Sequence, residues 1–318
     1  MINPVLSIII VSFNTKEITL NCLKSIKSDK KLQFDLSKIN PDNKIPSEII
    51  VIDNNSQDGS VPALKKLNYV KLIENKDNVG FGKANNQGLK ISRGNYVLFL
   101  NSDTVILHSA ISQSLDWLSS HPEASTCTAQ LLNKDKTIQA SGGFFPNILN
   151  VFTWSTGLDD LPLINQIIKP IHPHTPEFYT KDAFYTKDHP QDWVTGAFML
   201  TRKSTLDKVG GFDEDFFMYA EELELSYRIH KIFPNYCVYY LVGPQVIHLG
   251  GASAISKAHP ITNEYLGIIS FFKKHKSRLE QSIVRILLKI NASLRSIIYQ
   301  LKGNLTTSHF YQEACSKI

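Results

Sequence analysis

The feature that most constrains this chain is a regular alternation, over its first hundred residues, of short apolar runs with segments of helical spacing. The apolar runs are 5–11 (VLSIIIV), 48–52 (EIIVI), 69–73 and 95–100 (NYVLFL), and residues 16–26 between the first two carry apolar side chains at helical intervals. Strands buried on both faces of a parallel sheet have this continuous apolar character, and the helices between them make the crossover connections. The sequence therefore predicts an α/β fold, with a mostly parallel central sheet and helices on both faces.

Polar clusters follow three of the predicted strands. They begin at Ser12, Asp53 and Asn101, and they include Asn14 and Asp103. In open α/β sheets, ligands bind outside the carboxyl ends of the strands, so the clusters predict a site at one edge of the sheet. Ordinary turn chemistry is the alternative, because Asn, Asp and Ser are common in turns.

Asp103 follows the buried run 96–100 and predicts a cation site. Mg²⁺ typically binds one or two protein carboxylates together with substrate phosphates. A cation there would stabilise the charge that develops on a departing diphosphate. The alternative is that Asp103 caps the helix predicted to start near Ser109.

Composition excludes several classes of protein. The net charge of +5 is too small to indicate nucleic-acid binding. The four cysteines lie far apart without a CxxC pair, which excludes a zinc ribbon and is typical of reduced thiols in the cytosol. The first residues lack the features of a signal peptide, and no apolar stretch is long enough to predict a membrane-spanning helix.

Six segments, in this order, carry a family resemblance. They are 6–14 (LSIIIVSFN), 48–60 (EIIVIDNNSQDGS), 78–90 (NVGFGKANNQGLK), 96–104 (YVLFLNSDT), 193–231 (from WVTGAFML to SYRIHK) and 246–251 (VIHLGG). With them the sequence resembles family 2 glycosyltransferases, in the bacterial rhamnosyltransferase-like branch. The resemblance implies the GT-A fold over residues 1–262, with a nucleotide-binding half (1–104) and an acceptor-binding half (105–262).

The resemblance also implies roles on the donor side. Asp53 matches the aspartate that hydrogen-bonds the pyrimidine ring, and Ser12, Asn14 and Asn101 belong to the same nucleotide-sugar site. Lys83 opens a helix after a glycine-rich segment, where the helix N-terminus attracts anions; a solvated helix lysine is the alternative.

Two residues are implied to hold the metal, a divalent cation such as Mg²⁺ or Mn²⁺. Asp103 matches the last aspartate of the DxD motif, and His248 matches a histidine beside the diphosphate. The sequence departs from the motif, because Asn101 and Ser102 precede Asp103 where the branch often has Asn-Pro.

Glu222 aligns with the catalytic base of the family, where the usual residue is Asp. Glu221 and Glu224 flank it at the start of a predicted helix, and Glu224 with Arg228 forms an i,i+4 pair. Neighbouring helical residues point about 100° apart, so Glu222 can face the cleft while Glu221 faces elsewhere.

The acceptor-side wall is expected to include Trp193, Thr195 and Gly196. An aromatic face suits the apolar surface of a sugar ring, and a core position is the equal alternative for Trp193.

The predicted activity is an inverting, metal-dependent transfer of a sugar from a dTDP- or UDP-linked donor, with dTDP-rhamnose favoured. The acceptor would be a glycan or a lipid-linked glycan in bacterial surface polysaccharide synthesis, with no nucleic-acid partner. The alternatives are a nucleotidyltransferase and a non-catalytic glycan-binding protein. The first would need an arginine-containing, glycine-rich loop after the first strand, where residues 12–15 read SFNT.

Residues 263–318 form a predicted basic, amphipathic helical tail. Large aliphatic residues recur in steps of three and four from Ile283 to Leu301, and lysines and arginines accompany them. Such a helix indicates contact with a membrane surface, which suits a cytoplasmic enzyme at the inner face of the membrane. Packing on the catalytic domain and an oligomer seam are the alternatives.

Overall fold

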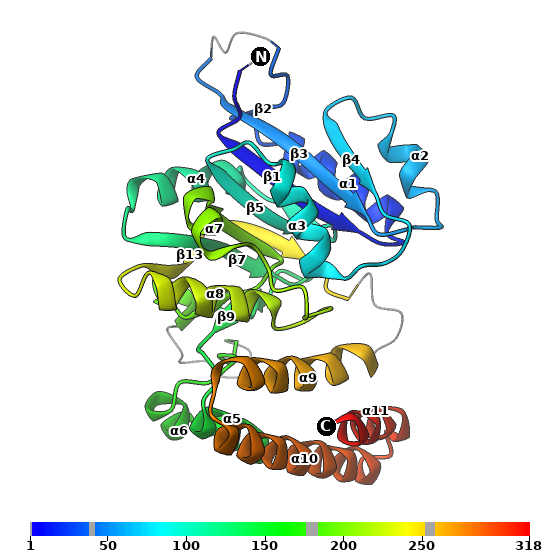
Figure 1. Ribbon diagram of the computed structural model, residues 1–318, viewed down its shortest axis with the longest axis vertical. Coiled ribbons are helices and arrows are strands. Elements are labelled where there is room, and N and C mark those ends of the chain that lie inside the picture. Colours follow the sequence, from blue (N-terminus) through cyan, green and yellow to red (C-terminus); the bar gives the residue numbers. More distant parts are fainter. Residues whose placement is uncertain (1, 38–41, 176–183, 252–257) are drawn as a thin grey trace.

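The computed structural model describes residues 2–37, 42–175, 184–251 and 258–318 (Figure 1). The described part contains an eleven-stranded mixed sheet, a two-stranded sheet, and a layer of helices at the C-terminal end of the chain. The prediction of an α/β fold is confirmed.

The strands are β1 (Leu6–Ser12), β2 (Leu32–Gln33), β3 (Ile45–Asp53), β4 (Val70–Glu74), β5 (Tyr96–Asn101), β6 (Thr104–Ile106), β7 (Ala124–Leu132), β8 (Ile138–Gln139), β9 (Gly142–Gly143), β10 (His189–Gln191), β11 (Trp193–Val194), β12 (Phe198–Arg202) and β13 (Cys237–His248). The α-helices are α1 (Lys16–Lys27), α2 (Ser60–Leu64), α3 (Phe81–Ile91), α4 (Ala110–Ser120), α5 (Ile148–Thr156), α6 (Pro162–Ile167), α7 (Lys203–Val209), α8 (Glu221–Ile232), α9 (Ala258–His275), α10 (Arg278–Leu301) and α11 (Leu305–Lys317). Two short 3₁₀ helices are η1 (Leu158–Asp160) and η2 (Phe184–Thr186).

The first half of the sheet is parallel, as predicted. β1 lies between β3 and β5 and pairs in parallel with both, and β4 continues the sheet beyond β3. These four strands are the four apolar runs of the sequence, and the helices between them make the crossovers.

The second half of the sheet is mixed. β12 pairs antiparallel with both β5 and β7, and β13 pairs in parallel with β7 and antiparallel with β6 and β10. Gly196 lies between β11 and β12, and Gly210, with φ +81°, follows α7.

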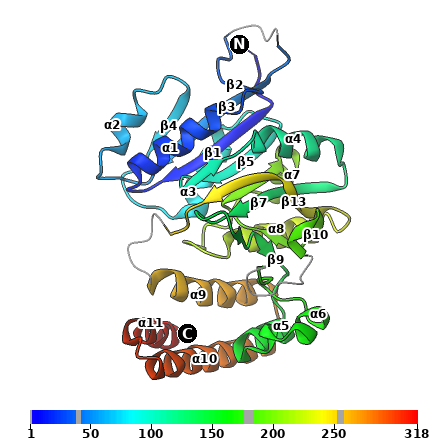
Figure 2. The same ribbon diagram turned by 180° about the vertical axis from the view of Figure 1, so that it is seen from behind.

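Strand periodicity distributes the core over both faces of the sheet. Ile8 and Ile10 of β1 join a cluster with α1 and α4, whereas Ile9 joins the cluster on the opposite face with α3, α7 and α8. Figure 1 shows α3, α7 and α8 on the near face, and Figure 2 shows α1 and α4 on the far one. Gly88 lets α3 pack close to the sheet, since a Cβ there would meet Ile9 Cγ2 at 2.6 Å.

A separate helical layer lies below the sheet. α9 lies between the sheet domain and the α10–α11 pair, and α5 packs along α10 (Figures 1 and 2). A third core cluster fills this layer, and it includes Trp193, Leu223, Tyr265 and Phe272. Among the described residues, none of the helices has the length and apolar character needed to cross a membrane.

Candidate functional site

The register of the strands brings the predicted polar clusters to one edge. Ser12 of β1 lies opposite Asp53 of β3, and Val11 lies opposite Asn101 of β5. The strand ends therefore meet as the topology predicts for a ligand site.

Side chains lock the first two strand-end loops together. Asn14 has a φ of +52°; its backbone N–H donates to Ser56 Oγ at 2.8 Å, and its Oδ1 accepts from the Gln57 N–H at 2.8 Å. Ser12 is buried and shares hydrogen bonds with the hydroxyls of Thr15 and Thr19, so it supports the loop from beneath. The Asn14 side chain is exposed at the site edge.

Asp53 carries an unused acceptor. The side chain is 1% exposed, Oδ1 accepts from the Ser56 N–H at 2.8 Å, and Oδ2 is buried without a partner in the described structure. A buried carboxylate oxygen without a partner is costly, and a ligand N–H would remove that cost. This arrangement fits the role predicted for Asp53.

The glycine-rich segment has a packing function. Gly80 has a φ of +86°, and a Cβ there would lie 2.6 Å from the Phe217 carbonyl oxygen, which accepts from the Phe81 N–H. A Cβ on Gly82 would meet Phe212 at 3.2 Å. These glycines therefore bring the start of α3 against residues 212–217. Lys83 is exposed on the same turn, and its contact with a donor stays a prediction.

The predicted metal residues come together, although they are far apart in the chain. His248 Nε2 lies 3.3 Å from Asp103 Oδ1 and 3.2 Å from Asn101 Nδ2. The antiparallel pairing of β13 with β6, which places His248 opposite Thr104, produces this proximity. The alternative reading of Asp103 as a helix cap is wrong, because α4 begins at Ala110 with no side-chain cap.

Gln139 hydrogen-bonds Nδ1 of the His248 ring, so that the other ring nitrogen, Nε2, faces Asp103. His248 Nδ1 lies 2.6 Å from Gln139 Oε1, and Gln139 Nε2 donates to the Asn133 side chain and to the His248 carbonyl. With the Gln139 amide in this orientation, Nδ1 donates to Gln139 Oε1, and a neutral ring would then leave the lone pair of Nε2 available. Metal-binding histidines are oriented in this way by a hydrogen bond from the other nitrogen. The pair of Nε2 and a carboxylate oxygen therefore fits a divalent cation.

The acidic pair lies at the start of α8. Glu222 is half-buried, and its Oε1 accepts from the Gly196 N–H at 3.3 Å; Glu221 is 3% exposed. Oε2 of each carboxyl group is buried without a partner in the described structure. Burial raises the pKa of Glu222, and burial together with the neighbouring charge of Glu222 raises the pKa of Glu221 well above its ordinary value. A raised pKa suits a general base.

Sequence reasoning did not identify Tyr219. Burial raises its pKa to about 12, and negative charges from Glu264, Glu221, Glu222 and Asp103 add to the effect. Tyr219 therefore lies within electrostatic reach of both Asp103 and the acidic pair. Tyr219 and Ala220 have φ values of +73° and +67°, which is strained backbone of the kind that clusters at functional sites. Nothing in the local sequence, which has no glycine here, signals this turn.

The acceptor-side residues divide into two kinds. Gly196 contacts Glu222 through its backbone, and a Cβ on it would come within 3.0 Å of the Phe81 ring. Thr195 is half-buried beside it, and its Oγ1 accepts from the Ala197 N–H. Trp193 is only 6% exposed and packs in the core of the helical layer, with the His172 ring on its edge. The structure thus places Trp193 as the core alternative describes.

Glu224 has the structural role predicted for it. Arg228 Nη2 lies 2.8 Å from its Oε2, and His275 Nε2 lies 3.1 Å from its Oε1. This link joins α8 to the end of α9.

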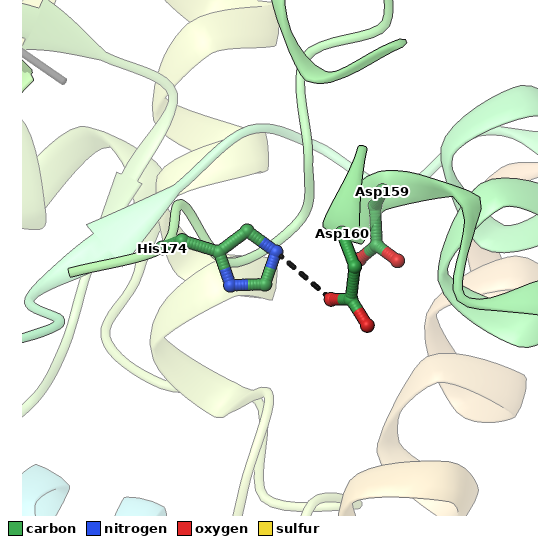
Figure 3. A group of neighbouring side chains, drawn as sticks. All are labelled: Asp159, Asp160 and His174. Atoms are coloured by element: carbon green, nitrogen blue, oxygen red, sulfur yellow. Dashed lines mark ion pairs between the residues drawn. The ribbon is translucent and has the colours of Figure 1, made fainter. Parts of the chain in front are cut away.

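A second group of side chains of the types that can ligate metals lies in the helical layer, beside α5. Figure 3 shows Asp159, Asp160 and His174, with His174 Nε2 3.3 Å from Asp160 Oδ1. Burial, followed by the charge of Asp160, raises the pKa of Asp159. An ion pair accounts for the approach of His174 to Asp160, and we assign no metal here.

Comparisons with solved structures define the fold class. The mannosyltransferase PcManGT from Pyrobaculum calidifontis, solved with GDP-Man and Mn²⁺, superposes with a TM-score of 0.55 at 14% identity, over 99% of this chain and 87% of that one. The chain has the GT-A fold of glycosyltransferases. The sequence model of glycosyl transferase family 2 matches residues 7–210, and the chain belongs to this family.

Two curated relatives are rhamnosyltransferases. N-acetylglucosaminyl-diphospho-decaprenol L-rhamnosyltransferase of Mycobacterium tuberculosis is 24% identical over 217 residues, which are 64% of this chain and 66% of the relative. Rhamnosyltransferase WbbL of Escherichia coli K12 is 29% identical over 158 residues, which are 47% of this chain and 54% of the relative. The matched segments thus span somewhat less than two thirds of either relative, and they support the rhamnosyltransferase-like branch.

Proposed function

We propose that the protein transfers a sugar, with inversion, from a nucleoside-diphosphate sugar to a glycan or lipid-linked acceptor in surface polysaccharide synthesis. Three observations support this proposal: Asp53 Oδ2 is buried without a hydrogen-bond partner in the described structure, His248 lies beside Asp103, and Glu222 accepts from the Gly196 N–H next to Ala197, whose carbonyl accepts from the Asn101 N–H. Residues 1–104 supply the donor half of the site, and residues 105–262 supply the acceptor half.

On the donor side, Asp53 Oδ2 accepts an N–H from the nucleotide base, and Asn14, Lys83 and Asn101 line the same edge. Asp103 and His248 would hold a divalent cation, which neutralises charge on the diphosphate as it leaves. Both relatives are rhamnosyltransferases, and the name of the mycobacterial relative specifies a lipid-linked acceptor. We therefore favour rhamnose as the sugar, carried by dTDP, and a lipid-linked acceptor.

In the chemical step, Glu222 removes the proton of an acceptor hydroxyl group. The hydroxyl oxygen attacks the anomeric carbon, the bond from that carbon to the diphosphate oxygen breaks on the opposite face, and Glu222 is left protonated. The Gly196 N–H orients the Glu222 carboxylate. General base catalysis of this kind contributes about 10²- to 10⁴-fold.

A donor panel tests the proposal. The purified chain is incubated with dTDP-rhamnose, UDP-glucose, UDP-N-acetylglucosamine and GDP-mannose, with Mg²⁺, with Mn²⁺ or with EDTA. We expect metal-dependent thermal stabilisation by one donor and slow release of its nucleoside diphosphate. Neither stabilisation nor release with any donor, with the metal present, would favour a non-catalytic glycan-binding protein.

A further inference from the structure

Helix α10 exposes the side that an ordinary packed helix would bury. The side chains it buries are mostly small or polar: Val284, Leu288, Asn291, Ala292 and Ser296. Asn291 Nδ2 donates to the carbonyls of Trp154 and Ser155 in α5, and Ser296 hydrogen-bonds Ser308 of α11. Hydrogen bonds as well as apolar contacts therefore fix the inward orientation of this helix.

Most large aliphatic residues of α10 point outward instead. Leu279 is 71% exposed, Ile286 60%, Ile297 53% and Leu301 83%. At about 100° per residue, the exposed aliphatic positions share one stripe roughly 120° wide. Most of the amphipathic stripe predicted from the sequence, from Ile290 to Leu301, thus faces away from the protein, whereas Ile283 and Leu287 are half-buried.

Other helices at the same end of the molecule carry further exposed apolar side chains. Of the 18 large hydrophobic side chains exposed in the described part of the chain, eight lie in residues 279–305 and five in residues 149–167. The second segment includes Leu163 and Ile167, which are 69% and 73% exposed. α5, α6 and α10 lie along the end of the molecule furthest from β2 (Figures 1 and 2). Apolar surface concentrated in this way marks an interaction site.

The charge around the stripe selects the partner. Residues 271–302 contain one acidic residue, Glu280, against eight lysines and arginines. Arg278, Arg285 and Lys289 are exposed on α10 itself, and Lys273 and Lys302 are exposed at its two ends. Long basic side chains reach from a helix toward lipid headgroups, and anionic lipids attract them. A second copy of this chain would bring like charges together.

We propose that the exposed face of α10, extended by α5 and α6, docks on an anionic lipid bilayer. The helix lies in the plane of the interface, with its aliphatic stripe among the acyl chains and its basic residues at the headgroups. This inference goes beyond the proposed function, and it can be tested by vesicle binding without any measurement of sugar transfer.

Vesicle sedimentation of the full chain tests the apolar contribution. Vesicles of phosphatidylcholine with about one third phosphatidylglycerol should sediment the wild type, and pure phosphatidylcholine should bind at least tenfold more weakly. The double variant Ile290→Gln/Ile297→Gln should lose at least tenfold in affinity. The matched control is Ile91→Gln/Ile232→Gln, whose side chains are of the same type and similar exposure, and it should bind like the wild type. Circular dichroism checks that both variants fold.

The charge contribution is tested separately. Lys289→Gln and Lys302→Gln should each weaken binding about fivefold, and added salt should reduce the difference. Lys30→Gln and Lys90→Gln, which are exposed on the sheet domain, should have no effect.

Three results would overturn the proposal. One is a wild type that fails to sediment with anionic vesicles at low salt. Another is equal vesicle binding by the two isoleucine double variants. The third is a wild-type dimer that Ile290→Gln/Ile297→Gln makes monomeric without any binding to vesicles, which would identify the face as a protein–protein interface.

Discussion

The carboxyl ends of β1, β3 and β5 and the helix α10 differ in where they place polar and apolar side chains. At the edge, β1, β3 and β5 are buried along most of their length, and polar side chains come at the point where the strands end. In α10, the buried side is largely small and polar, and large aliphatic residues face outward. The comparison teaches that the informative signal differs between the two regions. Polar residues after buried strands indicate the candidate ligand site, whereas exposed aliphatic residues on α10 indicate the proposed docking surface.

The two regions are physically joined. On α9, a Cβ at Gly267 would lie 2.8 Å from Ala220 Cβ and 2.9 Å from the Tyr219 carbonyl oxygen. Lys274 pairs with Asp213 and Asp215, and His275 pairs with Glu224. The helical layer therefore contacts the strained turn that precedes the acidic pair, and the predictions below separate its contribution from that of the sheet edge.

The largest effect is expected for Glu222→Gln. The amide cannot accept the hydroxyl proton, so the turnover number should fall about 10²- to 10⁴-fold while donor binding is kept. Release of nucleoside diphosphate measures turnover, and thermal stabilisation measures binding. Glu221→Gln is the control and should retain turnover within tenfold; the reverse result would assign the base to Glu221.

Asp103→Asn should reduce turnover by about 10²-fold and weaken Mn²⁺ binding by 10- to 100-fold, because the amide lacks the negative charge that holds the cation. Calorimetric titration with Mn²⁺ measures the binding directly. Asp116→Asn, at an exposed position paired with Lys31, is the control. Unchanged Mn²⁺ affinity in Asp103→Asn would place the cation elsewhere.

Gly267→Ala tests the junction between the two regions. The added methyl group must displace the Tyr219–Ala220 turn, which should lower the turnover number about tenfold and cost roughly 1–3 kcal/mol of unfolding free energy. The Michaelis constant for the donor should not change. Gly243→Ala is a matched control, since a Cβ there meets nothing within 4 Å. Equal turnover in the two variants would show that α9 does not position the acidic pair.

Glu221→Gln should stabilise the protein at pH values above 4.5, the ordinary pKa of a glutamate carboxyl group. The folded state holds the Glu221 proton to higher pH than the unfolded state, because burial raises the pKa from 4.5, so wild-type stability falls as the pH rises above 4.5. The variant removes this loss, and we expect a gain of roughly 1–3 kcal/mol at pH 8 and none at pH 4. Chemical denaturation at the two pH values measures it, and an equal gain at both would contradict a charge effect.

The sequence by itself predicted the parallel half of the sheet and the meeting of the polar clusters at one edge of it. Continuous short apolar runs are typical of strands covered on both faces. Since parallel strands end at a common edge, Ser12, Asp53 and Asn101 were expected to come near one another. The pairing of Glu224 with Arg228 was also local, since residues four apart share a helix face.

Only the tertiary structure decided which distant groups meet and which face of a helix is covered. His248 reaches Asp103 because β13 pairs with β6, and Gln139 then orients its ring. Burial of Trp193 depends on the helical layer that covers it. An amphipathic period shows that α10 has two faces, and the tertiary contacts of the helix, among them the hydrogen bonds of Asn291 to α5, decide which of them points inward.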